Sequence, residues 1–347
     1  MKICIDDKIP YIKGVLEPYA EVEYLPGGLA SPGKLRHADA LIIRTRTLCN
    51  ELTLAHSKIS FIATATIGYD HIDTDFCQRR AITWTNAAGC NADSVAMYIV
   101  CALKQLAKNH HFNLQDQCLG IVGLGHVGEK VAAVASQLGC RVLKNDPLRQ
   151  SAMLEGKTCS DNGLPYTDRA EDYISLDELM ARADIISLHP NLHYETPYAS
   201  YHLFDEKRLS QMQAHQILIN ASRGEVVDYK ALKEALKAQQ IKAAVLDVWE
   251  NEPNLDRELL DWVEIATPHI AGYAIDGKAR GTEMSVQALA RHFGITELYD
   301  WKVESLPSHT APYDILLDDA ALRQAPEQFE ELRAKSAITK VLSHCSW

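Results

Sequence analysis

The stretch from Cys118 to Gly128 reads CLGIVGLGHVG, and it decides the fold of this chain. Its apolar beginning predicts a buried strand at Leu119–Val122, and the following Glu129–Leu138 predicts a helix. Between the two lies a glycine string of the form GxGxxG. A strand, this turn and a helix in succession form the dinucleotide-binding unit of α/β proteins. We therefore expect a parallel sheet with a dinucleotide at its edge.

Each residue of the turn has a predicted task. Gly123 permits the tight turn, Gly125 lets the backbone approach a pyrophosphate, and Gly128 lets the helix lie close to the strand. His126 and Val127 begin the helix, whose free N–H groups and partial positive charge attract phosphates. These five residues are therefore predicted to bind the cofactor.

Asp146 follows the next expected strand, Cys140–Leu143, close to the roughly 20-residue spacing of the dinucleotide fingerprint. Its carboxylate can accept hydrogen bonds from both ribose hydroxyls and would repel a 2′-phosphate, which favours NAD over NADP. The alternative is a glycine turn without a ligand and a solvated Asp146. The strand before the turn and the helix after it argue against that alternative.

The composition limits the class of protein. With 347 residues the chain is expected to form two or three domains, and its net charge of −11 argues against nucleic acid as a partner. No stretch approaches the roughly 20 apolar residues of a membrane span, and the start MKICIDDKIP shows no cleavable signal pattern. The nine cysteines have no metal-ligand or disulfide spacing. We expect a cytoplasmic protein without a membrane partner or a metal.

Strands separated by helical segments predict the order of elements. In the first third of the chain we expect strands at Lys2–Ile5, Glu21–Leu25, Ala38–Ile43, Ile59–Ala63 and Ile82–Thr85. Further strands are expected at Asp184–Leu188, Gln216–Asn220, Ala243–Val248 and Val263–Ala266. Helices are expected at Pro10–Leu16, at 93–106, at Asp228–Gln239 and at Asp276–His292. The polar stretch Ser151–Asp172 is expected to be a surface excursion.

This order predicts an α/β fold of two Rossmann-like or flavodoxin-like lobes with parallel sheets, plus a small C-terminal extension. We expect residues 1–94 and 270–292 to form a substrate-binding lobe, and residues 95–269 to form the NAD-binding Rossmann domain. Residues 293–347 are expected to form a C-terminal dimerisation segment. Ligands are expected beyond the carboxyl ends of the strands.

Arg223, Glu252 and His269 each follow a strand of the NAD-binding half. Oxidation of a secondary alcohol needs a base for the hydroxyl proton, and histidine titrates in the right range. A carboxylate beside the histidine would orient it, and a guanidinium can hold a substrate carboxylate with two parallel hydrogen bonds. Each residue alone could be structural. Together, beside a dinucleotide fingerprint, they favour oxidation of a 2-hydroxy acid.

Several stretches resemble a known family. NASRGEVVD (Asn220–Asp228), LDVWENEP (Leu246–Pro253) and TPHIAG (Thr267–Gly272) resemble the D-isomer-specific 2-hydroxyacid dehydrogenases. TATIGYDHID (Thr64–Asp73), AAGCNADSVAMYI (Ala87–Ile99) and HIAGYAIDGKARGT (His269–Thr282) closely resemble the branch of that family that oxidises 4-phospho-D-erythronate. The resemblance covers Met1 to about Gly294.

The resemblance implies a reaction and a set of residues. The reaction is NAD-dependent formation of 2-oxo-3-hydroxy-4-phosphobutanoate, a step of bacterial pyridoxal 5′-phosphate biosynthesis, by a homodimer. The implied proton carrier is His269, with Arg223 and Glu252 beside it. The implied cofactor contacts are Asp146, Ala221, Ser222, Arg223, Asp247 and Gly272, and the implied substrate contacts are Thr45, Thr66 and Tyr273.

The substrate phosphate needs cations or N–H donors. Arg44 and Arg46 follow an expected strand and are the first candidates, and Lys278 and Arg280 are secondary ones. All four could instead be solvated surface charges.

The chain departs from the family pattern in two places. The family has His-Thr-Pro where this chain has His189-Pro190-Asn191, so a threonine contact to the cofactor is missing or moved. The tail after Gly294 is shorter than the resemblance leads us to expect. Its apolar residues could form a dimer interface or pack locally: Trp301, Leu306, Tyr313, Ile315 and Leu316.

Two other functions stay open. One is oxidation of another hydroxy acid, such as 3-phosphoglycerate, glycerate or lactate. The other is an NAD-sensing protein that keeps the fold without turnover. Retention of Arg223, Glu252 and His269 argues for catalysis.

Overall fold

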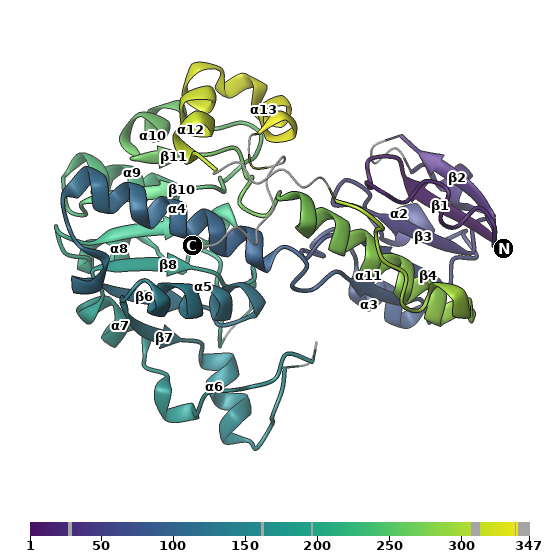
Figure 1. Cartoon of the computed structure of the whole chain (residues 1–347), viewed down its shortest axis with the longest axis horizontal. Coiled ribbons are helices and arrows are strands. Elements are labelled where there is room, and N and C mark those ends of the chain that lie inside the picture. The colour runs from purple at the N-terminus through teal and green to yellow at the C-terminus, as the bar shows by residue number, and fades with distance from the viewer. Residues whose placement is uncertain (27–29, 161–162, 196, 307–312, 337, 339–347) are drawn as a thin grey trace. The chain divides into compact units, whose positions relative to one another are not determined.

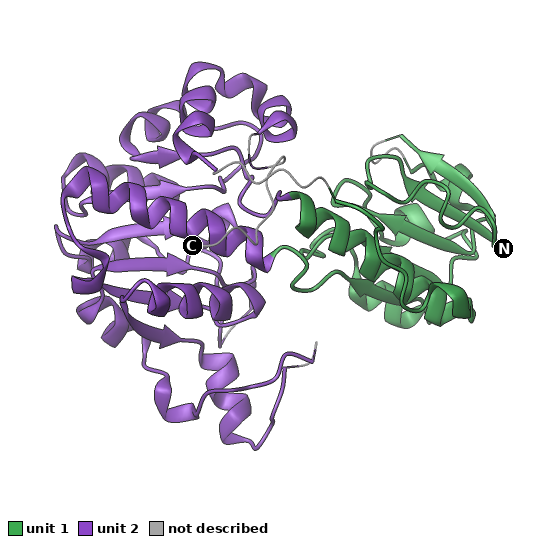
Figure 2. Ribbon diagram, in the orientation of Figure 1, with its two compact units in different colours: residues 1–91, 275–308 green, residues 92–274, 309–347 purple. Residues whose placement is uncertain are grey.

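The computed structural model describes residues 1–26, 30–160, 163–195, 197–306, 313–336 and 338. The chain divides into two compact units (Figure 2). Unit 1 consists of Met1–Asn91 and Ile275–Ser308, and unit 2 consists of Ala92–Ala274 and His309–Trp347. Both units are therefore built from segments that lie far apart in the sequence.

Unit 1 is built on a five-stranded parallel sheet in the order β2-β1-β3-β4-β5. The strands are β1 (Lys2–Asp6), β2 (Glu21–Leu25), β3 (Ala40–Ile43), β4 (Phe61–Thr64) and β5 (Thr83–Asn86). The order reverses between β1 and β3, so a crevice is expected at the carboxyl ends of these strands. β3 and β4 are neighbours and end side by side, because Ile43 pairs with Thr64.

Helices cover both faces of this sheet. One face packs on α11 (Ile275–Phe293), whose Val286, Leu289 and Ala290 are buried against residues of β1, β3 and β4. The other face packs on the short helices α1 (Pro32–Leu35), α2 (Glu51–Leu54) and α3 (Thr74–Arg79). Figure 1 shows α11, drawn in green, lying along this sheet although it comes some 190 residues after β5.

The helix expected at Pro10–Leu16 is wrong. The segment forms a series of turns, in which Tyr11 has φ +61° and Gly14 has φ +86°. A right-handed helix cannot pass through such residues. The apolar residues Ile12 and Leu16 are buried against the sheet from these turns.

Unit 2 is built on a six-stranded parallel sheet in the order β11-β10-β9-β8-β6-β7. The strands are β6 (Cys118–Val122), β7 (Arg141–Asn145), β8 (Ile185–Leu188), β9 (Ile217–Asn220), β10 (Ala243–Leu246) and β11 (Ile265–Ala266). The order reverses between β6 and β8. The glycine turn that follows β6 therefore lies at the switch point where doubly wound sheets bind nucleotides.

The two faces of this sheet carry different helices. On one face lie α4 (Ala92–His110) and α5 (His126–Gln137), which share a buried cluster with alternate residues of the strands. On the other lie α7 (Leu176–Arg182), α8 (Glu206–Gln211), α9 (Tyr229–Lys237) and α10 (Arg257–Trp262). Figure 1 shows α4 and α5 crossing in front of the strands. No described helix is long and apolar enough to span a bilayer.

The C-terminal segment returns to the edge strand β11. α12 (Ile315–Gln324) buries Ile315 in one core cluster and Leu322 in the other, and α13 (Phe329–Lys335) adds Phe329 to the second cluster. The Asp319 carboxylate accepts a hydrogen bond from the N–H of Ala266 at 2.7 Å. α12 therefore covers a strand edge that would otherwise expose an unpaired N–H group.

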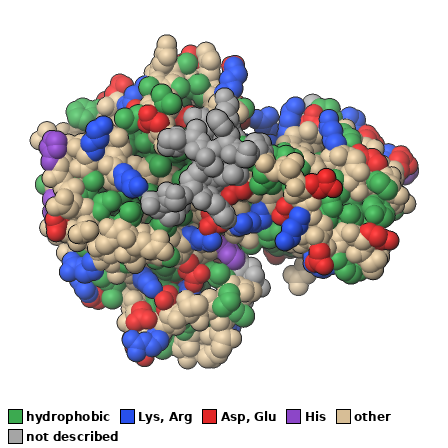
Figure 3. Space-filling model, in the orientation of Figure 1, with side chains coloured by type: hydrophobic (Ala, Val, Ile, Leu, Met, Phe, Trp, Pro, Cys, Tyr) green, Lys and Arg blue, Asp and Glu red, His purple; other side chains and the backbone are tan. Residues whose placement is uncertain are grey.

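Most of the apolar tail residues considered for a dimer interface are packed locally. Trp301 lies against the core of unit 1, whereas Ile315 is buried in unit 2 and Tyr313 packs beside it. Leu316 is the exposed residue of this group, and Leu317, which was not considered, is exposed beside it. Lys, Arg, Asp and Glu side chains are interspersed over the face drawn in Figure 3.

The excursion expected at Ser151–Asp172 is partly wrong. Its first residues belong to α6 (Pro147–Leu154), which Asp146 caps, and its end forms a short 3₁₀ turn at Ala170–Asp172. Tyr173 then forms an isolated parallel bridge with Lys144 of β7. The segment thus runs back beside the edge of the sheet.

Candidate active site

The glycine turn has the geometry that a bound dinucleotide needs. Gly123 has φ +88°, and a Cβ there would lie 2.7 Å from the backbone nitrogen of Pro190. A Cβ on Gly128 would overlap the carbonyl oxygen of Gly123. Around Gly125, by contrast, nothing lies within 4 Å of a Cβ position. Two glycines are thus required for packing, and the third faces open space where a pyrophosphate can approach.

The N-terminus of α5 is available to an anion. Its N-cap Gly125 provides no side-chain cap, so the first N–H groups of the helix keep their hydrogen-bonding capacity. His126 follows, and burial lowers the pKa of its imidazole. Its Nε2 is buried without a hydrogen-bond partner among the described residues. This end of the helix therefore fits the phosphates of NAD.

Asp146 faces the glycine turn. Its Oδ2 accepts a hydrogen bond from the N–H of Leu124 at 2.8 Å, and its Oδ1 accepts one from the N–H of Arg149 at 2.9 Å. An ionised carboxylate offers about four acceptor sites, so two remain for ribose hydroxyls. The arrangement fits NAD and leaves the expected 2′-phosphate repulsion in place.

His269 and Glu252 form a hydrogen-bonded pair. His269 Nδ1 lies 2.7 Å from Glu252 Oε2, and Glu252 Oε1 accepts a hydrogen bond from the N–H of Trp249 at 2.9 Å. Burial alone would raise the pKa of Glu252. The charge of His269 and these hydrogen bonds outweigh burial and lower it, so the carboxylate is ionised at neutral pH. Glu252 therefore holds a negative charge against Nδ1 of the imidazole.

Asp247 builds the loop that carries His269. Its carboxylate is 1% exposed and accepts hydrogen bonds from the hydroxyl of Thr267 and the N–H groups of Ile270 and Ala271, at 2.7 to 2.9 Å. Its backbone carbonyl accepts the N–H of His269 at 2.7 Å. Burial raises the pKa of Asp247. In this structure the carboxylate shapes the loop; the contact with the cofactor stays a prediction.

Asn220 shapes the turn that carries Arg223. Its side chain donates to the carbonyl of Arg223 at 2.9 Å and accepts from the N–H and hydroxyl of Ser222. Ala221 is half-buried in this turn, and Arg223 Nη1 donates to the carbonyl of Ser222 at 2.8 Å. The next residue, Gly224, touches the backbone of Trp249. The loops carrying Arg223 and Glu252 are therefore in direct contact.

The expected substrate residues of unit 1 lie at one edge of its sheet. Arg44 and Thr45 follow β3 directly, and Thr66 follows the neighbouring strand β4. The hydroxyl of Thr66 bonds that of Thr64 at 2.7 Å and donates to the carbonyl of Gly68. Lys278 and Arg280 belong to α11, and Arg46 is exposed. The parallel register thus brings Arg44, Thr45 and Thr66 together.

Tyr273 has a neighbour that the sequence did not indicate. The guanidinium carbon of Arg333, in α13, lies 4.7 Å from the centre of its ring. The same arginine helps to lower the pKa of Glu252. Arg333 comes 60 residues after Tyr273 in a segment without a motif, so nothing in the sequence pointed to it.

His189, in the loop that departs from the family pattern, lies at the end of β8. Its Nε2 bonds the hydroxyl of Ser187 at 2.9 Å, and its backbone lies against the turn at Gly123. Burial lowers the pKa of His189 to about 3, so the ring is neutral. It therefore adds no positive charge beside the dinucleotide.

The glycine turn lies at the switch point of the sheet, and the same unit carries a histidine paired with an ionised carboxylate. These two features define an NAD-dependent dehydrogenase of the α/β class. Among the described residues, no group of histidine, cysteine or acidic side chains could hold a metal ion. Residues 99–271 match the family "D-isomer specific 2-hydroxyacid dehydrogenase, NAD binding domain". The chain belongs to the D-isomer-specific 2-hydroxyacid dehydrogenase family and uses NAD as its cofactor.

Relatives of known name cover nearly the whole chain. An erythronate-4-phosphate dehydrogenase of Bacteroides fragilis is 44% identical over 96% of this chain and 95% of its own length. The enzyme of the same name from Escherichia coli O157:H7 is 38% identical over 96% of this chain and 90% of its own length.

Solved structures share the fold. The D-lactate dehydrogenase of Aquifex aeolicus, solved with NAD and lactic acid, is 24% identical and aligns with a TM-score of 0.64 over 89% of this chain and all of its own. The TT0316 protein of Thermus thermophilus is 25% identical, with a TM-score of 0.67 over 85% of this chain and 97% of its own.

Proposed function

We propose that this chain oxidises 4-phospho-D-erythronate with NAD, forming 2-oxo-3-hydroxy-4-phosphobutanoate for pyridoxal 5′-phosphate biosynthesis. The observation that supports this chemistry is the pair of His269 and Glu252, 2.7 Å apart, in the unit that contains the glycine turn. The relatives that are 38–44% identical over 96% of the chain support this substrate.

The reaction needs one proton acceptor and one anchor. His269 accepts the proton of the C2 hydroxyl at Nε2, while Glu252 stabilises the imidazolium through Nδ1. Arg223 holds the substrate carboxylate and polarises the oxygen at C2. NAD, held by the glycine turn and Asp146, would supply the hydride acceptor for C2. The C2–O bond becomes a carbonyl as the proton and the hydride leave.

The substrate phosphate is assigned to Arg44 first, because it stands beside Thr45 and Thr66 at one sheet edge. Arg46, Lys278 and Arg280 are further candidates. In R44A the ratio of kcat/KM for phosphorylated over unphosphorylated erythronate should fall about tenfold or more. An unchanged ratio removes Arg44 from the phosphate site.

The activity is tested by following NADH formation from NAD with 4-phospho-D-erythronate, 3-phosphoglycerate, glycerate and D-lactate, each with a carbonyl trap present. Fast turnover of phosphoerythronate alone supports the proposal. Turnover of another acid keeps the mechanism and overturns the substrate. Binding of NAD without turnover of any acid identifies a sensing protein instead.

We also propose that the protein is located in the cytoplasm and forms a homodimer. The eight described cysteines are free thiols, and all but Cys101 and Cys159 are buried, which suits a reducing compartment. The dimer rests on the family resemblance and on the exposed Leu316 and Leu317 of α12. Light scattering of the purified protein should give twice the chain mass; the mass of one chain would overturn the dimer.

A further inference from the structure

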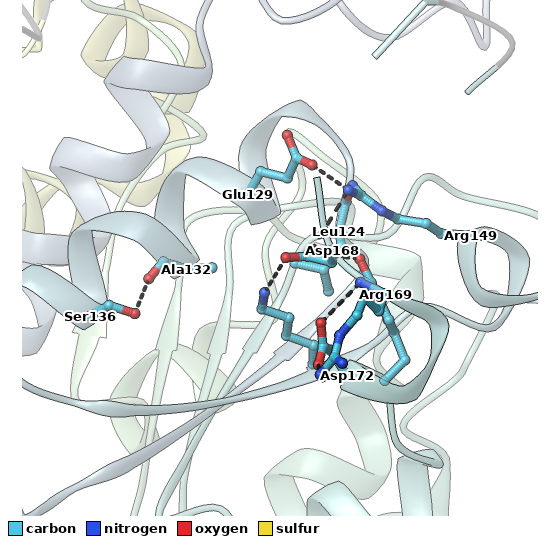
Figure 4. A network of polar contacts seen from close by, with 10 residues as sticks. Leu124, Glu129, Ala132, Ser136, Arg149, Asp168, Arg169 and Asp172 are labelled. Atoms are coloured by element: carbon cyan, nitrogen blue, oxygen red, sulfur yellow. Dashed lines mark hydrogen bonds and ion pairs between the residues drawn. The ribbon is translucent and has the colours of Figure 1, made fainter. Parts of the chain in front are cut away.

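A buried arginine lies beside the dinucleotide turn. Arg149 of α6 is only 3% exposed, although its guanidinium carries a full positive charge. Its Nη1 donates to the carbonyl of Leu124 at 2.6 Å, and its Nη2 lies 2.5 Å from Glu129 Oε1 (Figure 4). Leu124 belongs to the glycine turn and Glu129 to the first turns of α5. One side chain therefore contacts both the glycine turn and the start of α5, the two parts expected to bind the phosphates.

Residues at the start of α6 bind both the backbone N–H and the backbone carbonyl of Leu124. The N–H of Leu124 donates to Asp146, the N-cap of α6, and its carbonyl accepts from Arg149 in the same helical turn. The peptide groups on both sides of Leu124 are thus fixed. Those groups connect Gly123 with Gly125, whose open side is where the pyrophosphate approaches. The shape of the turn depends on α6 and not only on its glycines.

The surface segment after α6 encloses this arginine. The ring of Tyr166 lies 4.7 Å from the guanidinium carbon, and the ring of Tyr173 lies 5.9 Å from it. The Asp168 carboxylate lies 3.8 Å from Nη2 and is itself held by Lys144 at 2.9 Å and by the hydroxyl of Tyr173 at 3.0 Å. Two carboxylates and two aromatic faces therefore compensate a charge that burial would otherwise make costly.

Here the neighbouring cations are already neutralised. Glu129 and Asp168 balance Arg149 and Lys144, whereas Asp146 accepts backbone N–H groups and is the carboxylate predicted to bind the ribose. A buried guanidinium that is enclosed in this way cannot swing out to a ligand without depriving Glu129 of its ion pair and losing the contacts with Asp168 and the two rings. Arg149 therefore acts on the dinucleotide through the turn and not by direct contact.

We propose that Arg149 is a positioning residue for NAD, which holds the Gly123–Gly125 turn in its phosphate-accepting shape, and that Asp168 of the surface segment keeps it in place. The segment around Tyr166 and Asp168 is then part of the cofactor site, although it lies some 40 residues beyond the fingerprint. This inference rests on NAD binding and is independent of the proposed substrate.

The test is the affinity of the full-length protein for NAD and for ADP-ribose, measured by calorimetry on R149M, R149K and D168N. Arg169 and Asp172 provide matched controls, because they form an ion pair on the same segment with Arg169 78% exposed, and Figure 4 shows them beside the cluster. R169M and D172N repeat the same chemical changes without touching Leu124.

R149M should bind NAD and ADP-ribose about 10-fold to 100-fold more weakly, the range expected for losing a charge-assisted hydrogen bond. D168N should be weakened less, and R149K should recover part of the loss. The turnover rate at saturating NAD should stay near that of the unchanged protein, since the chemistry lies elsewhere.

Unchanged NAD affinity in a folded R149M overturns the inference, and so does an equal loss in R169M. If R149M does not fold, R149K and D168N decide the matter in the same way. A loss of kcat without a loss of NAD affinity would instead assign Arg149 to the chemical step and would also contradict the inference. Failure of the proposed substrate assay leaves these binding measurements unaffected.

Discussion

His269 owes its position to a backbone conformation that few side chains adopt. Its φ is +54°, and Asn251, just before Glu252, has φ +61°. Such conformations cost about 1–3 kcal/mol each and persist only where the surroundings impose them. The buried carboxylate of Asp247 does this for His269 through the N–H groups of Ile270 and Ala271. The loop therefore aims the imidazole before any substrate arrives.

Replacement of Glu252 by glutamine should impair the chemical step. The amide keeps the shape of the side chain but removes the charge that stabilises the imidazolium, so kcat should fall by about 10² to 10⁴. NAD affinity should stay unchanged in a direct titration. The matched control is E264Q, because Glu264 pairs with His110 at the same distance of 2.7 Å outside the site. Near-full turnover by E252Q would contradict the mechanism.

His189 should make the folded state sensitive to acid. Burial lowers its pKa to about 3, whereas the unfolded chain titrates near 6.5. Stability from this residue is complete above about pH 6.5 and falls as the pH drops, because only the unfolded chain takes up the proton. The loss should reach about 2 kcal/mol at pH 5.

H189N should remove this dependence. Urea unfolding at pH 7 and pH 5 would show a smaller drop in stability for the variant than for the unchanged protein. H111N is the control, since His111 is exposed and its φ of +56° suits asparagine. An equal drop in both variants would mean that His189 is protonated in the folded protein.

At the scale of elements, the contact between two loops decides whether the site assembles. The loop after β9 carries Arg223 and the loop after β10 carries Glu252, and they meet where Gly224 lies on the backbone of Trp249. Trp249 also donates its indole N–H to the carbonyl of Thr267 at 2.9 Å, in the loop of His269. These contacts fix the three loops relative to one another.

G224A should disturb all three loops. Its Cβ would overlap the backbone of Trp249 and Glu250, which cannot rotate away, so the folded state should lose about 1–3 kcal/mol or more. Turnover should fall together with stability. G33A is the control, because nothing lies within 4 Å of a Cβ at this exposed helical glycine. Full activity and stability in G224A would show that the loops can separate without consequence.

At the scale of the whole molecule, the chain leaves each unit and later returns to it. α11 returns to cover the sheet of unit 1, and α12 returns to close the edge of the sheet in unit 2. In α12, Arg323 ion-pairs with Asp319 and donates to the carbonyls of Leu260 and Val263. We therefore expect α12 to stabilise the NAD-binding unit.

D319A should weaken this closure. It leaves the N–H of Ala266 without its acceptor and Arg323 without its counter-ion, a loss of about 1.5–3 kcal/mol in urea unfolding. The exposed edge of β11 should also promote association of the variant. D300A is the control, because the Asp300 side chain is 99% exposed. Equal stability of D319A and D300A would exclude the role of α12 as an edge cover.

Residue patterns along the chain were sufficient for the two parallel sheets. Each strand is a short apolar run, and each expected strand overlaps an observed one, with ends that differ by up to two residues. The helix prediction for Pro10–Leu16 was wrong. The spacing of its apolar residues is helical, but Tyr11 and Gly14 adopt left-handed backbone conformations that prevent a helix. Backbone conformation of that kind is set by packing against the sheet, which the local pattern does not contain.

The glycine turn, Asp146 and the triad of Arg223, Glu252 and His269 were recognisable from the sequence, because each requires a particular residue type at the end of a strand. The sequence did not point to the supporting contacts of four other residues: Arg149, Arg333, Asn220 and Asp319. Their roles depend on contacts made across the fold, and arginine, asparagine and aspartate are ordinary residues at such positions. The sequence by itself determined which groups are predicted to do the chemistry. Only the tertiary structure decided which groups hold them in place, because that choice depends on distances between segments that folding alone brings together.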